Sequence, residues 1–208
     1  MTGLLILIVI TPIFPPDKPL LVMELFFDLV LITGVISIGT MGGHRVPFFL
    51  LTAVTLAVRW ADVLMEHGGL VISAAGLSVA WLSYALVIIV PALFRQRDVT
   101  LNTIYGAIVV YLLIAVAFTF LFGLIEFRSP GAFSGMPEGE AGRPGAVSNA
   151  LLYFSLTSLT TMGYGDIVPV HGLARSFSVL EGAMGQLYLA ITIARLVGLH
   201  IATERSGD

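Results

Sequence analysis

Residues 160–166 of this 208-residue chain read Thr-Thr-Met-Gly-Tyr-Gly-Asp. Glycine occupies two alternate positions in this segment, 163 and 165, and larger residues stand between and before them. Successive carbonyl groups of an ordinary strand alternate in direction, but left-handed residues at intervals turn them to one side, and glycine adopts that conformation with little steric penalty. We therefore predict an extended segment whose carbonyl groups face a common axis.

The composition around this segment is that of a membrane protein. Hydrophobic residues make up 57% of the chain and charged residues only 11%, and the mean hydropathy is +0.99. A soluble domain of this length would need more polar residues to cover its surface. The net charge of −3 provides no basic surface for nucleic acid, and the absence of cysteine excludes disulfides and thiolate metal sites. We expect an integral, multi-pass protein of the plasma (cell inner) membrane, in contact with lipids and without a nucleic-acid partner.

Apolar stretches long enough to cross a bilayer as helices occur four times before the 160–166 segment and once after it. Residues 1–14 add a sixth crossing if they span; without them there are five, and we expect six. The predicted fold class is therefore all-α and transmembrane. The five longer spans are 20–41, 46–65, 70–94, 104–126 and 173–202.

The region between the last two spans has two parts. Residues 128–147, rich in proline and glycine, predict a solvated loop. Residues 148–160 predict a helix of about 12 residues and ~18 Å, which is half a membrane thickness, with Ser148 as a plausible N-cap. A half-helix that enters the membrane and returns as extended chain is tolerated only where it lines a water-filled path.

This arrangement resembles the pore of the potassium channel family, in its prokaryotic type, whose filter signature is Thr-x-Gly-Tyr-Gly. The resemblance covers residues 104–202, about half of the chain. It implies a filter in which carbonyl oxygens, together with the Thr161 hydroxyl, replace the water that K+ must shed. One such segment per chain implies a homotetramer, because the pathway needs four. The implied filter residues are Thr161, Met162, Gly163, Tyr164 and Gly165, of which the first four hold K+.

Neighbouring positions match the same family in register. Tyr153 and Phe154 fall where family members carry an aromatic cuff around the filter, and Asp166 falls where a carboxylate hydrogen-bonds that cuff. Thr160 completes the implied filter support. Met162 stands where valine or isoleucine is usual, and its flexible side chain is expected to loosen the packing behind the filter.

The last span carries the candidate gating and cavity residues. Gly185 falls at the hinge position of the family's inner helix, whereas we expect Gly182 to serve close helix packing. Gln186 and Leu189 are expected to follow the hinge on the cavity side.

Glu181 is an ionisable residue inside this span, and such residues are rare and functional. We expect the hydroxyl of Thr157 or Ser158 to satisfy it. Two roles stay open: a structural hydrogen bond, or a protonation site that makes gating pH-sensitive.

The helices before the pore lack the repeated arginines of a voltage sensor, since the 70–94 span carries no charge before Arg95. Asp28 and Arg59 lie at similar depths in two earlier spans, which predicts a buried ion pair. We divide the chain into N-terminal membrane helices without an arginine ladder (1–99), a pore module (100–202) and a short tail that we expect to be cytosolic (203–208).

The combined prediction is a voltage-insensitive potassium channel subunit that conducts passively and has no cofactor besides the permeant K+. It is not an enzyme, because no nucleophile–base pair or metal-ligand spacing occurs. Two alternatives stay open: a weakly selective cation channel, and a transporter or accessory membrane protein whose pore motif is vestigial.

Overall fold

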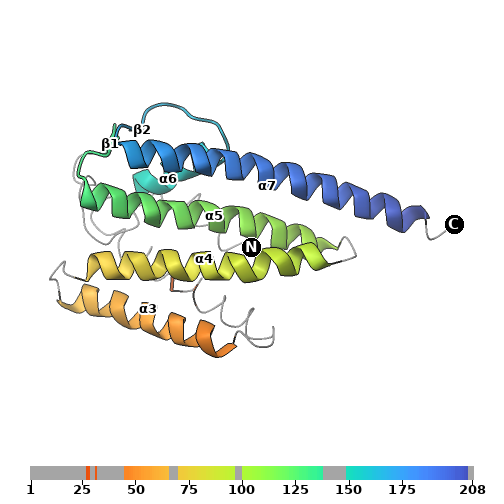
Figure 1. Ribbon diagram of the computed structural model, residues 1–208, viewed down its shortest axis with the longest axis horizontal. Helices are drawn as coiled ribbons and strands as arrows, with labels where there is room; N and C mark the ends of the chain where they lie inside the picture. Colours follow the sequence, from red (N-terminus) through yellow and green to blue (C-terminus); the bar gives the residue numbers. More distant parts are fainter. Residues whose placement is uncertain are drawn as a thin grey trace.

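The computed structural model describes residues 27, 28, 31, 45–65, 70–96, 100–137 and 149–205. The expectations for residues 1–14, for most of the 20–41 span and for Ser148 lie outside these ranges. The described part is almost entirely helical (Figure 1). Its elements are α3 (Arg45–Met65), α4 (Val71–Arg95), α5 (Leu101–Arg128), β1 (Phe133–Ser134), α6 (Asn149–Leu159), β2 (Val168–Pro169) and α7 (Gly172–Arg205).

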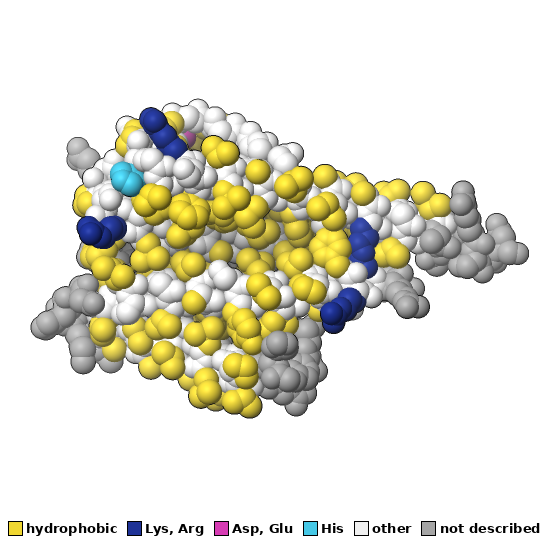
Figure 2. Space-filling view, viewed as in Figure 1, with side chains coloured by type: hydrophobic (Ala, Val, Ile, Leu, Met, Phe, Trp, Pro, Cys, Tyr) yellow, Lys and Arg dark blue, Asp and Glu magenta, His cyan; other side chains and the backbone are white. Residues whose placement is uncertain are grey.

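The four long helices lie side by side in one row, in the order α3, α4, α5 and α7 (Figure 1). Three of them are long and apolar enough to cross a membrane: α4, α5 and residues 172–199 of α7. They coincide with the predicted spans at 70–94, 104–126 and 173–202. On the face shown in Figure 2, hydrophobic side chains cover the middle of the row, and basic side chains lie toward its two ends. This distribution suits helices that stand across a bilayer.

The short helix α6 packs against both α5 and α7. Its 11 residues are too few to cross a membrane, as the half-helix prediction requires. Two aromatic clusters hold the row together. One lies between α5 and α6 around Phe122, and the other lies among α3, α4 and α5 around Trp81. The Trp81 indole N–H donates to the Thr52 hydroxyl at 2.7 Å, which ties α4 to α3 through the buried layer.

The start of α5 is determined by its capping residues. Thr100 and Thr103 form a capping box, in which each side chain accepts from the backbone N–H of the other (3.3 and 3.4 Å). Only a few residues separate the end of α4 from this cap, so α4 packs directly along α5 of its own chain.

The first part of the chain after α5, residues 129–137, is more closely packed than the solvated loop that its composition predicts. Ala132 and Phe133 are buried, and Phe133–Ser134 pairs antiparallel with Val168–Pro169. The backbone N–H groups of Gly131 and Phe133 donate to the carboxylate of Glu126, which is buried at the end of α5 (2.8 and 3.2 Å). This acid satisfies donors that the loop would otherwise expose to solvent, so residues 129–137 form a packed strap beside the 160–166 segment. The rest of the predicted loop lies outside the described residues.

Candidate functional site

The site begins where α6 ends. The chain turns tightly at this point, since the Thr161 N–H donates to the Ser158 carbonyl (3.0 Å) and the Gly163 N–H donates to the Thr157 carbonyl (3.2 Å). From there the chain runs without regular structure to β2, and every residue from 160 to 166 is exposed in the single chain. A polar backbone segment that is exposed in this way needs neighbours or water inside a membrane.

The backbone of this segment alternates in handedness. Thr161, Gly163 and Gly165 have positive φ angles of 60°, 52° and 80°, while Met162 and Tyr164 between them do not. Alternation of this kind turns successive carbonyl groups toward the same side, which an ordinary strand cannot do. The glycines occupy the positions where left-handed backbone was predicted. Thr161 was not predicted to be left-handed, because a threonine side chain gives no sign of that conformation.

The aromatic residues beside the segment separate into two groups. The rings of Tyr153 and Tyr164 stack in parallel, with centroids 6.2 Å apart and an interplanar angle of 5°. The Tyr153 hydroxyl also bonds to Asp166, and this hydrogen bond is the main cause that raises the pKa of Tyr153 above its ordinary value of 10.0. The structure thus brings together two of the predicted support residues, Tyr153 and Asp166, with Tyr164 of the predicted filter.

Phe154 lies elsewhere. Its ring is buried and meets Phe122 and Phe133 edge-on, at centroid distances of 5.3 and 5.1 Å. Within one chain it therefore belongs to the core between α6, α5 and the strap, and of the two predicted cuff residues only Tyr153 lies beside the segment. Adjacent residues on a helix point about 100° apart, which is why Tyr153 and Phe154 reach different neighbours.

The strap approaches the outer end of the segment at Gly135. A Cβ atom at this glycine would lie 1.9 Å from the Asp166 carbonyl oxygen, and its φ of +84° is also left-handed. Only glycine permits this approach. The sequence alone does not show that the strap belongs to the site, since glycine is common in any loop.

Two contacts between α6 and α7, made by Glu181 and Gly185, differ from those that the sequence predicts. Glu181 is fully buried and bonds to the Ser155 hydroxyl, not to Thr157 or Ser158. The Thr157 hydroxyl donates instead to the Phe154 carbonyl of its own helix (2.9 Å). The reason is helical register, because position 155 lies on the side of α6 that faces α7 at the level of residue 181.

Gly185 is a contact point in this structure. A Cβ atom there would lie 2.2 Å from the carbonyl oxygen of Leu159, the last residue of α6, whereas one at Gly182 would lie 3.4 Å from the nearest atom. α7 is continuous through both positions. The close packing expected of Gly182 therefore occurs at Gly185, and the hinge stays a prediction.

The two predicted cavity residues are both exposed on α7. The Gln186 amide nitrogen lies 3.2 Å from the Thr161 hydroxyl at the base of the segment. Leu189 is exposed one turn further along α7, toward its C-terminal end.

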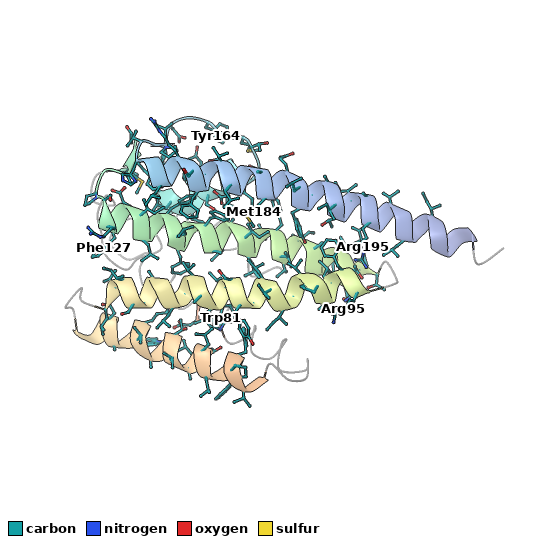
Figure 3. The ribbon with its side chains drawn as sticks, in the orientation of Figure 1. Trp81, Arg95, Phe127, Tyr164, Met184 and Arg195 are labelled. Carbon is teal, nitrogen blue, oxygen red and sulfur yellow. The ribbon has the colours of Figure 1, made fainter. Side chains whose placement is uncertain are left out.

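Two arginines join helices outside this site. Arg59 lies 3.6 Å from the Asp28 carboxylate, so the structure brings together the pair predicted from helix depth, and the Trp60 indole N–H also donates to Asp28 (3.1 Å). Arg195, near the cytosolic end expected for α7, donates to the carbonyls of Leu93 and Gln96 at the end of α4 (3.0 and 2.5 Å). Figure 3 shows Arg195 at the same end of the bundle as Arg95. The sequence does not indicate this link, because a single arginine near the end of a span usually marks the membrane interface.

Comparison with known proteins gives one family. The family model described as "Ion channel" matches residues 107–200, from within α5 through α6 to α7. This stretch, which is less than half of the chain, is similar to an ion channel domain. It contains the half-helix, the alternating segment and the helix that packs behind them, which supports an ion channel that is integral to a membrane.

Two relatives each match about half of the chain. The Protein LctB of Geobacillus stearothermophilus is 24% identical over 98 residues, which is 47% of this chain and 72% of that protein. The Protein LctB of Bacillus caldotenax is 22% identical over the same shares of the two chains. No solved structure matches the chain.

Proposed function

We propose that this protein is one subunit of a homotetrameric, potassium-selective channel that conducts passively. The observation that carries the proposal is the alternating handedness of Thr161, Gly163 and Gly165 inside an ion channel domain. Carbonyl groups turned to one side form rings of oxygens when four segments surround an axis, and such rings replace the hydration shell of K+.

The surface of the single chain supports assembly. Within residues 172–199 of α7, only 11% of the apolar stretch that could cross the membrane is buried in the single chain, although this helix lies next to the site. Tyr164 and Met162 are 67% and 64% exposed. Both observations fit a chain whose pore face is completed by further copies around an axis.

The α4 helix supports voltage-insensitive conduction. It carries one basic residue, Arg95 in its last turn, and no acidic residue in its first turn. A helix without charge in the membrane field gains no energy from a change in potential.

The proposal is tested by single-channel recording from purified protein in defined lipid with opposed K+ and Na+ gradients. A selective channel reverses near the K+ equilibrium potential. Reversal near zero would instead favour a weakly selective cation channel, and coupled flux that saturates, without unitary current, would favour a transporter.

The segment is tested in the same recordings by Gly163→Ala, since alanine is strained at a φ of 52°. This variant and Tyr164→Ala are expected to abolish selective current. Gly76→Ala in α4 is the matched control, because a Cβ atom there meets nothing within 4 Å. Selective current in Gly163→Ala would contradict the proposal.

A further inference from the structure

The contact between Gln186 and Thr161 stands at the inner end of the segment, where α7 passes the end of α6. It depends on Gly185, whose missing side chain lets α7 come against the Leu159 carbonyl. The next residue of α7 then reaches the first residue of the alternating segment across 25 positions of sequence. Both side chains are exposed in the single chain, which leaves them open to a neighbouring subunit or to the pore of the proposed channel.

The direction of this hydrogen bond follows from a count of protons. The Thr161 hydroxyl donates its single proton to the Thr160 carbonyl at 2.7 Å. A hydroxyl has one proton and two lone pairs, so Thr161 can only accept from Gln186. The amide nitrogen of Gln186 is therefore the atom that faces Thr161, at 3.2 Å.

This bond uses an oxygen that the pore needs. A cation at the innermost site is held by lone pairs, and the Thr161 hydroxyl has two. One of them is occupied by an amide N–H, whose hydrogen carries partial positive charge. In a tetramer the same arrangement occurs four times around the axis.

We propose that Gln186 is a specificity-determining residue of the innermost ion site, and that its amide lowers the affinity of this site for cations. The inference rests on the proposed function, because it concerns an ion site that four copies of the segment create. It predicts an inner site that binds cations more weakly than sites formed by carbonyl groups alone, and so releases them more readily to the cavity.

Ba2+ is a suitable probe, since a divalent cation interacts with the same oxygens about twice as strongly as K+. It is applied from the side of the membrane where α7 ends, and its apparent Kd for block is measured in wild type and in Gln186→Leu. We expect Gln186→Leu to bind Ba2+ about tenfold more tightly, a difference of about 1.4 kcal/mol, which is the size of an ordinary hydrogen bond.

A second variant, Gln186→Asn, keeps an amide but is one methylene too short to reach the hydroxyl. We expect it to bind Ba2+ as tightly as Gln186→Leu does. If Gln186→Asn behaves like wild type, the polarity of the cavity, and not the hydrogen bond, controls the site, and the inference is wrong. Equal Ba2+ affinity in all three proteins would also overturn it.

The reversal potential in K+ and Na+ gradients, recorded in the same bilayers, separates the two proposals. Loss of selectivity in the wild type would overturn the proposed function. A selective wild type whose Ba2+ block does not change in either variant would overturn only the role of Gln186. Exposed position 186 carries no core packing, so we expect both variants to assemble; gel filtration before recording checks this.

Discussion

The contact between Gly185 and the end of α6 makes a quantitative prediction. In Gly185→Ala the new Cβ atom would stand 2.2 Å from the Leu159 carbonyl oxygen and 3.1 Å from the Leu159 carbonyl carbon. These are backbone atoms at the junction with the 160–166 segment, so they cannot rotate away as a side chain would. Overpacking of this kind costs about 1–3 kcal/mol, and the contact is close enough to place it near the upper value.

Alanine also has an advantage in a helix. Replacing glycine by alanine inside a helix stabilises it by about 1 kcal/mol. The expected net result for Gly185→Ala is therefore a loss of about 2 kcal/mol in the free energy of unfolding. Because the displaced atom belongs to Leu159, we also expect the segment to shift and selective current to fall.

Gly182→Ala is the matched control, one helical turn away on the same helix. Its Cβ atom would lie 3.4 Å from the Ser158 carbonyl oxygen, which is an ordinary contact. This variant should be stabilised by about 1 kcal/mol, because alanine has a higher helix propensity than glycine. The free energies of unfolding of the two variants should therefore differ by about 3 kcal/mol.

The assay is denaturant unfolding of the purified protein in detergent, followed by near-ultraviolet circular dichroism, with channel recording in parallel. Equal stability of the two variants would refute the packing argument. Gly185→Ala with normal stability but a changed open probability would instead favour the hinge that the family resemblance implies.

Three further predictions concern the buried and polar contacts. The buried Glu181 carboxyl accepts from the Ser155 hydroxyl. Glu181→Gln keeps a side-chain oxygen that can accept this bond and should retain assembly, whereas Glu181→Ala removes the acceptor and should lower the yield of assembled protein on gel filtration. A pH dependence of the current that is the same in wild type and in Glu181→Gln would exclude a gating role for this carboxyl. Either Asp28→Arg or Arg59→Asp alone should destabilise the protein by about 3–5 kcal/mol, as expected for a broken buried pair, and the double exchange should restore most of this loss in thermal unfolding; no recovery would argue against direct pairing. Tyr153→Phe should have a lower melting temperature than wild type at neutral pH, because it loses the hydrogen bond to Asp166. This hydrogen bond raises the pKa of Tyr153, so the extra stability of wild type should disappear as the pH rises through the raised pKa. A difference in melting temperature that stays the same at high pH would contradict the bond.

Much of the fold could be predicted because each membrane helix can be recognised from its own apolar sequence. The spans at 70–94, 104–126 and 173–202 are continuous apolar stretches, and a bilayer offers such stretches no alternative to a helix. The pairing of Asp28 with Arg59 was also predictable, since a buried charge needs a partner at similar depth.

The contacts between helices could not be predicted in the same way. Glu181 bonds to Ser155, and not to the neighbouring hydroxyls, because of the rotation of α6 relative to α7. Phe154 joins the core while Tyr153 stays beside the segment for the same reason. If α6 were rotated by one residue about its axis, these neighbours would be exchanged. No local sequence pattern indicates this rotation.

Two features follow from the amino-acid sequence without a structure: the chain lies in a membrane as helices, and residues 160–166 interrupt these helices with glycine at alternate positions. Hydrophobicity and the conformational freedom of glycine are properties of single residues, so they can be read without a structure. Three other features are visible only in the folded chain: Gly185 packs against α6, Thr161 is left-handed, and Gln186 reaches Thr161. Those three facts depend on the distance and rotation between α6 and α7, and the packing of all their side chains sets both quantities together.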